Sequence, residues 1–227
     1  MTGSKTRVTR AAALCLATGL VVASCGGSND EAGQKPTVTT SPSPSSTVKV
    51  PQAVALTEVG ADLSFGDTAT VIYEPDQKSG TVLDLRVEKA EQGSIKDFSG
   101  FILDDQTKKS TPYYVDVQVK NVGEGTVGGQ AVPLWGVDGE NTLLPPARFT
   151  ATFDRCPSDP LPKKFEPEDS FSTCLVFLAP NEGAMKAVSF RPNQQFDPIQ
   201  WTGEILTPKP EPKKTQGGKK SKGKNGG

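Results

Sequence analysis

The chain has 227 residues, with 25 lysines and arginines against 26 aspartates and glutamates, a net charge of −1 and no histidine. The missing histidine excludes Ser-His-Asp and Cys-His triads, histidine-ligated metals and imidazole acid–base catalysis. The balanced total hides an uneven distribution. Residues 36–206 carry a net charge of −9, from 14 basic and 23 acidic side chains, whereas residues 207–227 carry +6, from seven lysines and one glutamate.

Residues 1–24 have the composition of a secretory signal peptide. Three basic residues precede an uncharged run of 13 residues, Ala11 to Ala23, which is shorter than the roughly 20 residues of a membrane-spanning helix. Val22-Ala23-Ser24-Cys25, at the end of this run, resembles a bacterial lipobox, in which the signal is cleaved before the cysteine and the cysteine carries lipid. We therefore expect Cys25 to anchor the protein at the extracytoplasmic face of the cell membrane. Ordinary secretion with an incidental cysteine is the alternative.

Two flanking segments have compositions typical of disordered chain. Residues 25–50 are poor in apolar residues and rich in Ser, Thr, Pro and Gly, which predicts a flexible tether. Residues 207–227 are rich in lysine and glycine and predict a disordered tail. This tail is either a solvated solubilising segment or a contact for anionic lipid or cell-wall polymer. Nucleic acid is not an expected partner in this compartment.

Residues 51–206 are long enough to form one domain with its own core. Apolar residues alternate with polar ones in 81–90 and in 113–121, a period of two that indicates half-buried antiparallel strands. Turn signals occur at Gly128-Gly129 and Asp138-Gly139. Seven or eight short strands predict an immunoglobulin-like antiparallel β-sandwich. The further strands are expected at 67–73, 131–137, 147–153, 170–178 and 185–191, with a final candidate at 201–206.

Two cysteines are left for the folded domain, because Cys15 lies in the signal peptide and Cys25 at the anchor. In an exported chain Cys156 and Cys174 favour a disulfide, which contributes about 3 kcal/mol in the chain-entropy model. It would hold the proline-rich connection 157–173 onto the following strand. A zinc site would lack further soft ligands, and a redox pair usually has much closer cysteines.

No residue pattern identifies a catalytic, metal or cofactor site. The acids at 104–105 and between 166 and 169 could ligate Ca²⁺ or form an acid/base pair, but neither cluster has the ligand spacing of a calcium loop. Ser46-Thr47-Val48-Lys49 matches the S-x-x-K of penicillin-binding enzymes, and Lys78-Ser79-Gly80 loosely resembles their K-T-G. The first lies in the tether, however, whereas such a serine opens a packed helix. We expect no enzyme; a carboxylate-based hydrolase is the remaining catalytic alternative.

Eight aromatic side chains lie on or beside expected strands. A core role is the default for them, and an exposed binding patch is the alternative. Trp135 precedes both cysteines rather than lying between them, so an antibody-type domain is not supported. The eight are Tyr113, Tyr114, Trp135, Phe149, Phe153, Phe171, Phe177 and Trp201.

The chain also resembles a known group of proteins. The runs GFILDDQTKKSTPYYVDVQVKNVGEGTVGG, VPLWGVDG, FDRCP, LPKKFEPEDSFSTCLVFL, VSFRP and WTG look like those of actinobacterial lipoproteins of unknown function. Their domain is similar to the telokin-like, immunoglobulin-type sandwich of secreted mycobacterial antigens. The resemblance spans about Gly60 to Gly203 and implies the sandwich, the extracytoplasmic compartment and the pairing of Cys156 with Cys174. It implies no reaction. The expected function is therefore a non-enzymatic binding or interaction module, with a structural envelope component that uses the basic tail as the alternative.

Overall fold

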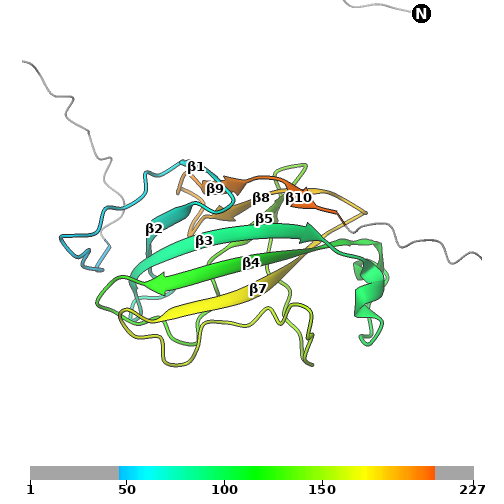
Figure 1. Ribbon diagram of the computed structural model, residues 1–227, viewed down its shortest axis with the longest axis horizontal. Coiled ribbons are helices and arrows are strands. Elements are labelled where there is room, and N and C mark those ends of the chain that lie inside the picture. Colours follow the sequence, from blue (N-terminus) through cyan, green and yellow to red (C-terminus); the bar gives the residue numbers. More distant parts are fainter. Residues whose placement is uncertain (1–45, 208–227) are drawn as a thin grey trace, which may run out of the picture. The chain divides into compact units, whose positions relative to one another are not determined.

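The computed structural model describes residues 46–207, which form two β-sheets packed against each other (Figure 1). One sheet has the strand order β1-β9-β8-β5-β6, and the other has the order β10-β3-β4-β7, with β2 also paired to β3. The expected all-β sandwich is confirmed. The elements are β1 (Asp62–Ser64), β2 (Thr68–Tyr73), β3 (Thr81–Gln92), η1 (Ile95–Phe98), η2 (Thr107–Lys109), β4 (Thr111–Asn121), β5 (Trp135–Asp138), β6 (Leu143–Leu144), β7 (Ser170–Ala179), β8 (Met185–Phe190), β9 (Ile199–Thr202) and β10 (Ile205–Leu206).

Several sequence predictions fall on other parts of the chain. The signal peptide, the lipobox cysteine Cys25, most of the 25–50 tether and residues 208–227 lie outside the described residues. Within residues 46–207, no helix is long and apolar enough to cross a membrane.

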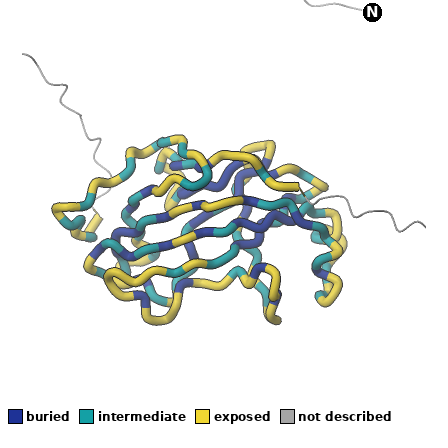
Figure 2. Tube along the Cα trace, viewed as in Figure 1, coloured by how far each residue is buried: buried dark blue, intermediate teal, exposed yellow. Residues whose placement is uncertain are grey.

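The long strands β3 and β4 follow directly from the alternating sequence. Leu85 pairs with Val119 and Val87 with Val117 in an antiparallel ladder, and these four side chains are at most 1% exposed. The polar residues between them face outward, so buried and exposed positions alternate along both strands (Figure 2). A shift of the register by one residue would turn the apolar set toward water, which is why this pattern fixes the pairing.

The strand predictions differ from the structure at three places. Residues 147–153 form no strand, so this prediction was wrong. They follow Pro145 and Pro146, which have no N–H for a ladder. The strand expected at 131–137 starts only at Trp135, just after Pro133. The structure has ten strands rather than seven or eight because β1 and β6 were not predicted and the last candidate is split into β9 and β10. β1 and β10 form short parallel pairs at sheet edges, whereas the other pairs are antiparallel.

The main core lies between the two sheets. At one end of it, the buried side-chain amide of Asn121 forms hydrogen bonds with three other segments. Trp201 is fully buried, and its indole N–H donates to the carbonyl of Asp67 at 3.0 Å. At the end of β4 the Asn121 side chain accepts from the Thr81 hydroxyl at 2.7 Å and donates to the carbonyls of Gly125 and Phe165, at 2.8 and 3.3 Å. Asn121 therefore ties the turn after β4 to the start of β3 and to a distant loop.

A second apolar cluster lies on the outer face of the β3-β4-β7 sheet; we call it the aromatic cluster. It contains Phe98, Tyr114, Phe153, Cys156 and Val176, with Phe101 and Phe149 packed against it. The rings of Phe98 and Phe153 stack with centroids 4.7 Å apart. The cluster is thus built from η1, from the outward-facing side chains of β4 and β7, and from the irregular segment that precedes β7.

Candidate binding cleft

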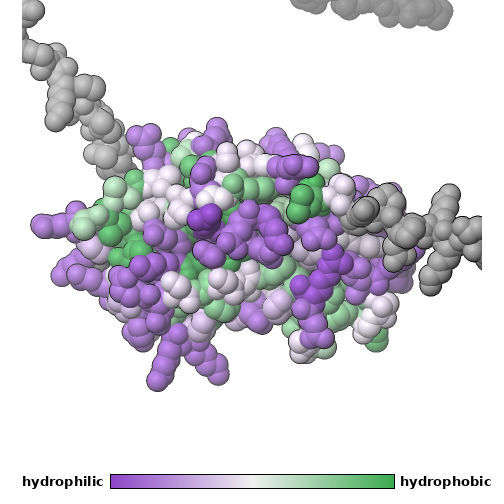
Figure 3. Space-filling model, in the orientation of Figure 1, coloured by the Kyte–Doolittle hydropathy of each residue, from purple (hydrophilic) through white to green (hydrophobic). Residues whose placement is uncertain are grey.

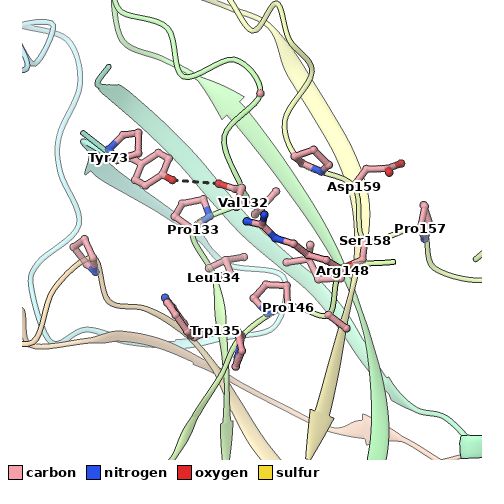
Figure 4. A pocket seen from close by; sticks show the side chains of 18 of the residues that line it. Tyr73, Val132, Pro133, Leu134, Trp135, Pro146, Arg148, Pro157, Ser158 and Asp159 are labelled. Atoms are coloured by element: carbon pink, nitrogen blue, oxygen red, sulfur yellow. Dashed lines mark hydrogen bonds between the residues drawn. The ribbon is translucent and has the colours of Figure 1, made fainter. Parts of the chain in front are cut away.

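A cleft of about 590 Å³ lies among the described residues (Figure 4). Four stretches of chain line it together with Leu175 of β7: the end of β2, the segment before β5, residues 145–160, which we call the wall segment, and the residues after β8. A volume of this size is in the usual range for ligand sites. Its lining is Tyr73, Glu74, Pro75, Gly129, Ala131, Val132, Pro133, Leu134, Trp135, Pro145, Pro146, Ala147, Arg148, Phe149, Pro157, Ser158, Asp159, Pro160, Leu175, Arg191 and Pro192.

The wall segment is fastened to the free edge of β7. The N–H of Ala147 donates to the carbonyl of Val176 at 2.7 Å, and the N–H of Ser158 donates to the carbonyl of Cys174 at 2.9 Å. The hydroxyl of Ser158 accepts from the N–H of Val176 at 3.3 Å. Ser158 adopts φ of +56°, a left-handed conformation that is unfavourable for serine, and its two contacts with β7 compensate for this. The edge is thereby covered against pairing with another chain.

The predicted disulfide between Cys156 and Cys174 is confirmed, with Cα atoms 5.0 Å apart. It joins the wall segment to β7, as expected from the sequence. Next to it Arg155 donates to Asp97 at 3.0 Å and to Glu91 at 2.7 Å, and its guanidinium lies 4.5 Å from the centroid of the Tyr114 ring. Disulfide, ion pairs and ring contact together hold this side of the cleft in place.

The opposite wall is held by Tyr73. Its hydroxyl donates to the carbonyl of Ala131 at 3.3 Å, the bond drawn in Figure 4. Burial, together with the nearby carboxylate of Asp76, raises the pKa of Tyr73 above that of a free tyrosine. The phenol therefore remains a donor at neutral pH and connects β2 to the segment that leads into β5.

Two arginines supply the positive charge of the cleft. Arg148 is exposed, and in Figure 4 its side chain extends into the cleft toward Val132, whereas the carboxylate of Asp159 points away from it. Arg191 donates to the carbonyl of Gln194 at 2.9 Å, while its Nε is buried and has no hydrogen-bond partner among residues 46–207. Neither guanidinium forms an ion pair within the described part of the chain.

The chain enters the domain beside this cleft. The N–H and the hydroxyl of Thr47 both donate to Glu74, at 3.1 and 2.9 Å, and Glu74 lies at the rim. The pKa of Glu74 is held below its usual value, chiefly by a hydrogen bond from the Ser46 hydroxyl. Residues 47–49 and 78–80 line a small polar hollow together. Ser46 is not on a helix, however, so the S-x-x-K and K-T-G matches do not form the arrangement of penicillin-binding enzymes.

The acidic residues considered as ligands have structural partners instead. Asp104 accepts from the backbone N–H groups of Gln106 and Thr107, at 3.0 and 2.7 Å. Glu168 pairs with Lys120 at 2.7 Å. Within residues 46–207, no three carboxylates or thiols are placed to hold a metal ion.

The expected aromatic residues divide between core and cleft. Tyr113, Phe177 and Trp201 are in the main core, and Tyr114 and Phe153 are in the aromatic cluster. Trp135 and Phe149 are only half-buried and line the cleft; Phe171 is half-buried against the main core. Sequence reasoning did not identify Arg148, Arg191 or Tyr73 as site residues. The density of prolines between 133 and 160 could have drawn attention to Arg148, whereas Tyr73 and Arg191 lie outside that stretch and have no such signal.

No family model matches the chain, and no curated protein or solved structure shows significant similarity to it.

Proposed function

We propose that the protein is a lipid-anchored extracytoplasmic lipoprotein whose sandwich domain acts as a non-enzymatic binding module, with the cleft as its binding site. The observation that carries the binding role is the cleft itself, a rigid apolar hollow that contains two arginines without a carboxylate partner. The lipobox-like residues that end at Cys25 support the anchor. The disulfide supports an oxidising compartment, where such bonds persist.

The rigidity of the cleft favours binding over catalysis. Both long walls are fixed by hydrogen bonds, and prolines restrict the backbone of several lining segments. A pre-organised site loses little conformational entropy when a ligand binds. Of the two carboxylates in the lining, Glu74 accepts from Thr47, and Asp159 points away from the cleft (Figure 4).

The proposed membrane localisation can be tested by substitution of the anchor cysteine. Cys25→Ser should release the protein from the membrane fraction or leave its signal peptide uncleaved, because lipid can no longer be attached. Cys15→Ser is the matched control and should behave as the unaltered protein does. A Cys25→Ser protein that is still processed and still partitions with the membrane would exclude the anchor.

The binding role can be tested by photo-crosslinking in intact cells. A photo-reactive amino acid at Ala131, inside the cleft, should give a reproducible adduct with a cellular partner. The same amino acid at Thr68, an exposed residue of β2 away from the cleft, is the control. Adducts of equal yield at both positions, or no adduct at Ala131, would contradict a binding role for the cleft.

A structural role in the envelope is the second candidate, and the charge distribution favours it. The seven lysines of residues 207–227 follow β10, which pairs with Ala90 and Glu91 near the end of β3. The chain enters beside Gly80 at the start of β3, so entry and exit are separated by about 30 Å of strand. The lysine-rich segment thus follows the domain at the far end of β3 from the entry of the chain, and its positive charge suits contact with anionic polymer. Deletion of residues 207–227 should then abolish salt-sensitive binding to cell envelopes while leaving the adduct at Ala131 intact.

A further inference from the structure

The walls of the cleft offer a ligand apolar contact but few backbone donors. Seven of the lining residues are prolines, which have fixed φ angles and no N–H. They come from all four stretches of chain that form the cleft, and Tyr73, Trp135 and Phe149 lie among them. The prolines are Pro75, Pro133, Pro145, Pro146, Pro157, Pro160 and Pro192.

The free donors of the cleft are therefore side chains. The indole N–H of Trp135 has no acceptor within residues 46–207, in contrast to that of Trp201, which is bonded to a carbonyl. Arg148 extends into the cleft, and Arg191 keeps a buried Nε without a partner. The Nε of Arg191 is a buried donor without an acceptor, which is costly, whereas the exposed Arg148 adds a second, solvated cation. The occupant should thus supply acceptors, at least one of them anionic.

An extended peptide fits this combination of surfaces. In the polyproline II conformation a chain forms no internal hydrogen bonds and presents its carbonyl groups as acceptors. Aromatic-lined grooves recognise such peptides through ring contacts with proline and a few side-chain donors. A glycan would need backbone and side-chain donors for its many oxygen atoms, and the prolines of the walls supply no N–H groups.

We propose that the cleft binds an extended, proline-containing segment of a partner protein that carries an acidic residue. Its carboxylate pairs with Arg148 and Arg191, a main-chain carbonyl accepts from Trp135, and its prolines pack against the rings of Tyr73 and Phe149. This inference rests on the proposed binding role of the cleft and adds the chemistry of the ligand.

The chain provides its own spectroscopic probe for this binding. It contains two tryptophans; Trp201 is fully buried, whereas Trp135 is half-buried in the cleft. A change in tryptophan emission on adding a ligand therefore reports on Trp135. The variant Trp135→Phe should lose the change and shows whether the signal comes from the cleft.

The test titrates the purified full chain with three capped peptides, which consist of Pro-Pro-Glu, Pro-Pro-Gln and Pro-Pro-Lys repeats. The glutamate peptide should perturb Trp135 and bind at least tenfold more tightly than the glutamine peptide, because a charge-assisted bond to an arginine is lost in the latter. Arg148→Gln should weaken binding of the glutamate peptide about tenfold. Arg86→Gln, an exposed arginine on β3 outside the cleft, is the matched control and should leave it unchanged.

Several results would overturn the proposal. These are equal binding of the glutamate and glutamine peptides, no response of Trp135 to any peptide, and a response to vesicles containing anionic lipid in place of the peptides. Failure of the peptide test can be distinguished from failure of the proposed binding role. A partner crosslinked at Ala131 in cells, together with no preference for the glutamate peptide, would leave the binding role intact and reject only this ligand class.

Discussion

Replacing both Cys156 and Cys174 with alanine should lower the free energy of unfolding by about 3 kcal/mol. The two residues are 18 positions apart, and closing a loop of this length restricts the unfolded chain by that amount in the chain-entropy model. For a domain of 150 to 250 residues, each kcal/mol corresponds to roughly 2–4 °C in Tm, so the midpoint should fall by about 6 to 12 °C. Thermal and urea unfolding followed by circular dichroism measure both quantities.

The loss should be global rather than a local opening of the wall segment. That segment keeps its hydrogen bonds from Ala147 and Ser158 to β7, the ion pairs of Arg155, and the stack of Phe153 on Phe98. The emission of Trp135 in the native protein should therefore be the same in the double variant and the original chain.

Reductant provides the control for this experiment. It should lower the Tm of the original chain by the same amount and leave that of the double variant unchanged. Reduction under native conditions should be slow, because Cys156 is fully buried. The reasoning is refuted if the double variant unfolds at the same midpoint as the original chain, or if its Trp135 emission shifts while the midpoint stays constant.

Three further changes probe other parts of the domain. Phe98→Ala removes a ring that is 2% exposed at the centre of the aromatic cluster and should cost about 3–5 kcal/mol in urea unfolding. Asn121→Ala leaves the groups that it bonds, including the Thr81 hydroxyl, without partners; a loss of about 2–4 kcal/mol is expected, and a loss below 1 kcal/mol would contradict the account. Burial, and then the hydrogen bond to Asp97, raise the pKa of Tyr114 above that of a free tyrosine. As the pH rises, the unfolded chain therefore loses the Tyr114 proton before the folded chain does. The free energy of unfolding should be constant below about pH 10 and decrease as the pH rises further. Unfolding measured between pH 8 and 11 should show a smaller decrease for Tyr114→Phe than for the original chain.

The sandwich could be predicted because its longest strands carry a local signal. In β3 and β4 apolar and polar residues alternate over many positions. This alternation alone is enough to predict a strand that buries one face. The disulfide could be predicted because the chain leaves two cysteines for the folded domain. The polar residues that alternate with the core residues of β3 and β4 lie on the face in Figure 3, which shows mainly hydrophilic side chains over β3, β4 and β7.

The wrong strand prediction at 147–153 shows the limit of prediction from local sequence. Ala147, Phe149, Ala151 and Phe153 alternate with polar residues as well as those of β3 do. They lie along the free edge of β7, but of these four residues only Ala147 bonds to it through its N–H, and two prolines precede them. The rings of Phe149 and Phe153 pack instead onto Phe98, a residue about 50 positions earlier, and this contact has no signature in a short window of sequence.

The cleft could not be predicted for the same reason. Tyr73 and Arg191 lie more than 100 residues apart and meet only because β2 and β8 end near the same side of the sandwich. Each lining residue has an ordinary local explanation: a strand end, a turn proline or a surface arginine. Their common property, a proline-rich hollow that contains two arginines, exists only in the folded chain.

The wall segment also couples the cleft to the stability of the domain. Phe149 lines the cleft and at the same time packs 5.9 Å from Phe98 in the aromatic cluster, so the two sites share a side chain. Removal of the Phe98 ring takes away a contact that holds Phe149 in the cleft wall. Phe98→Ala should therefore weaken ligand binding although it touches no ligand, whereas Asn121→Ala, at a similar cost in stability but without contact to the wall segment, should not.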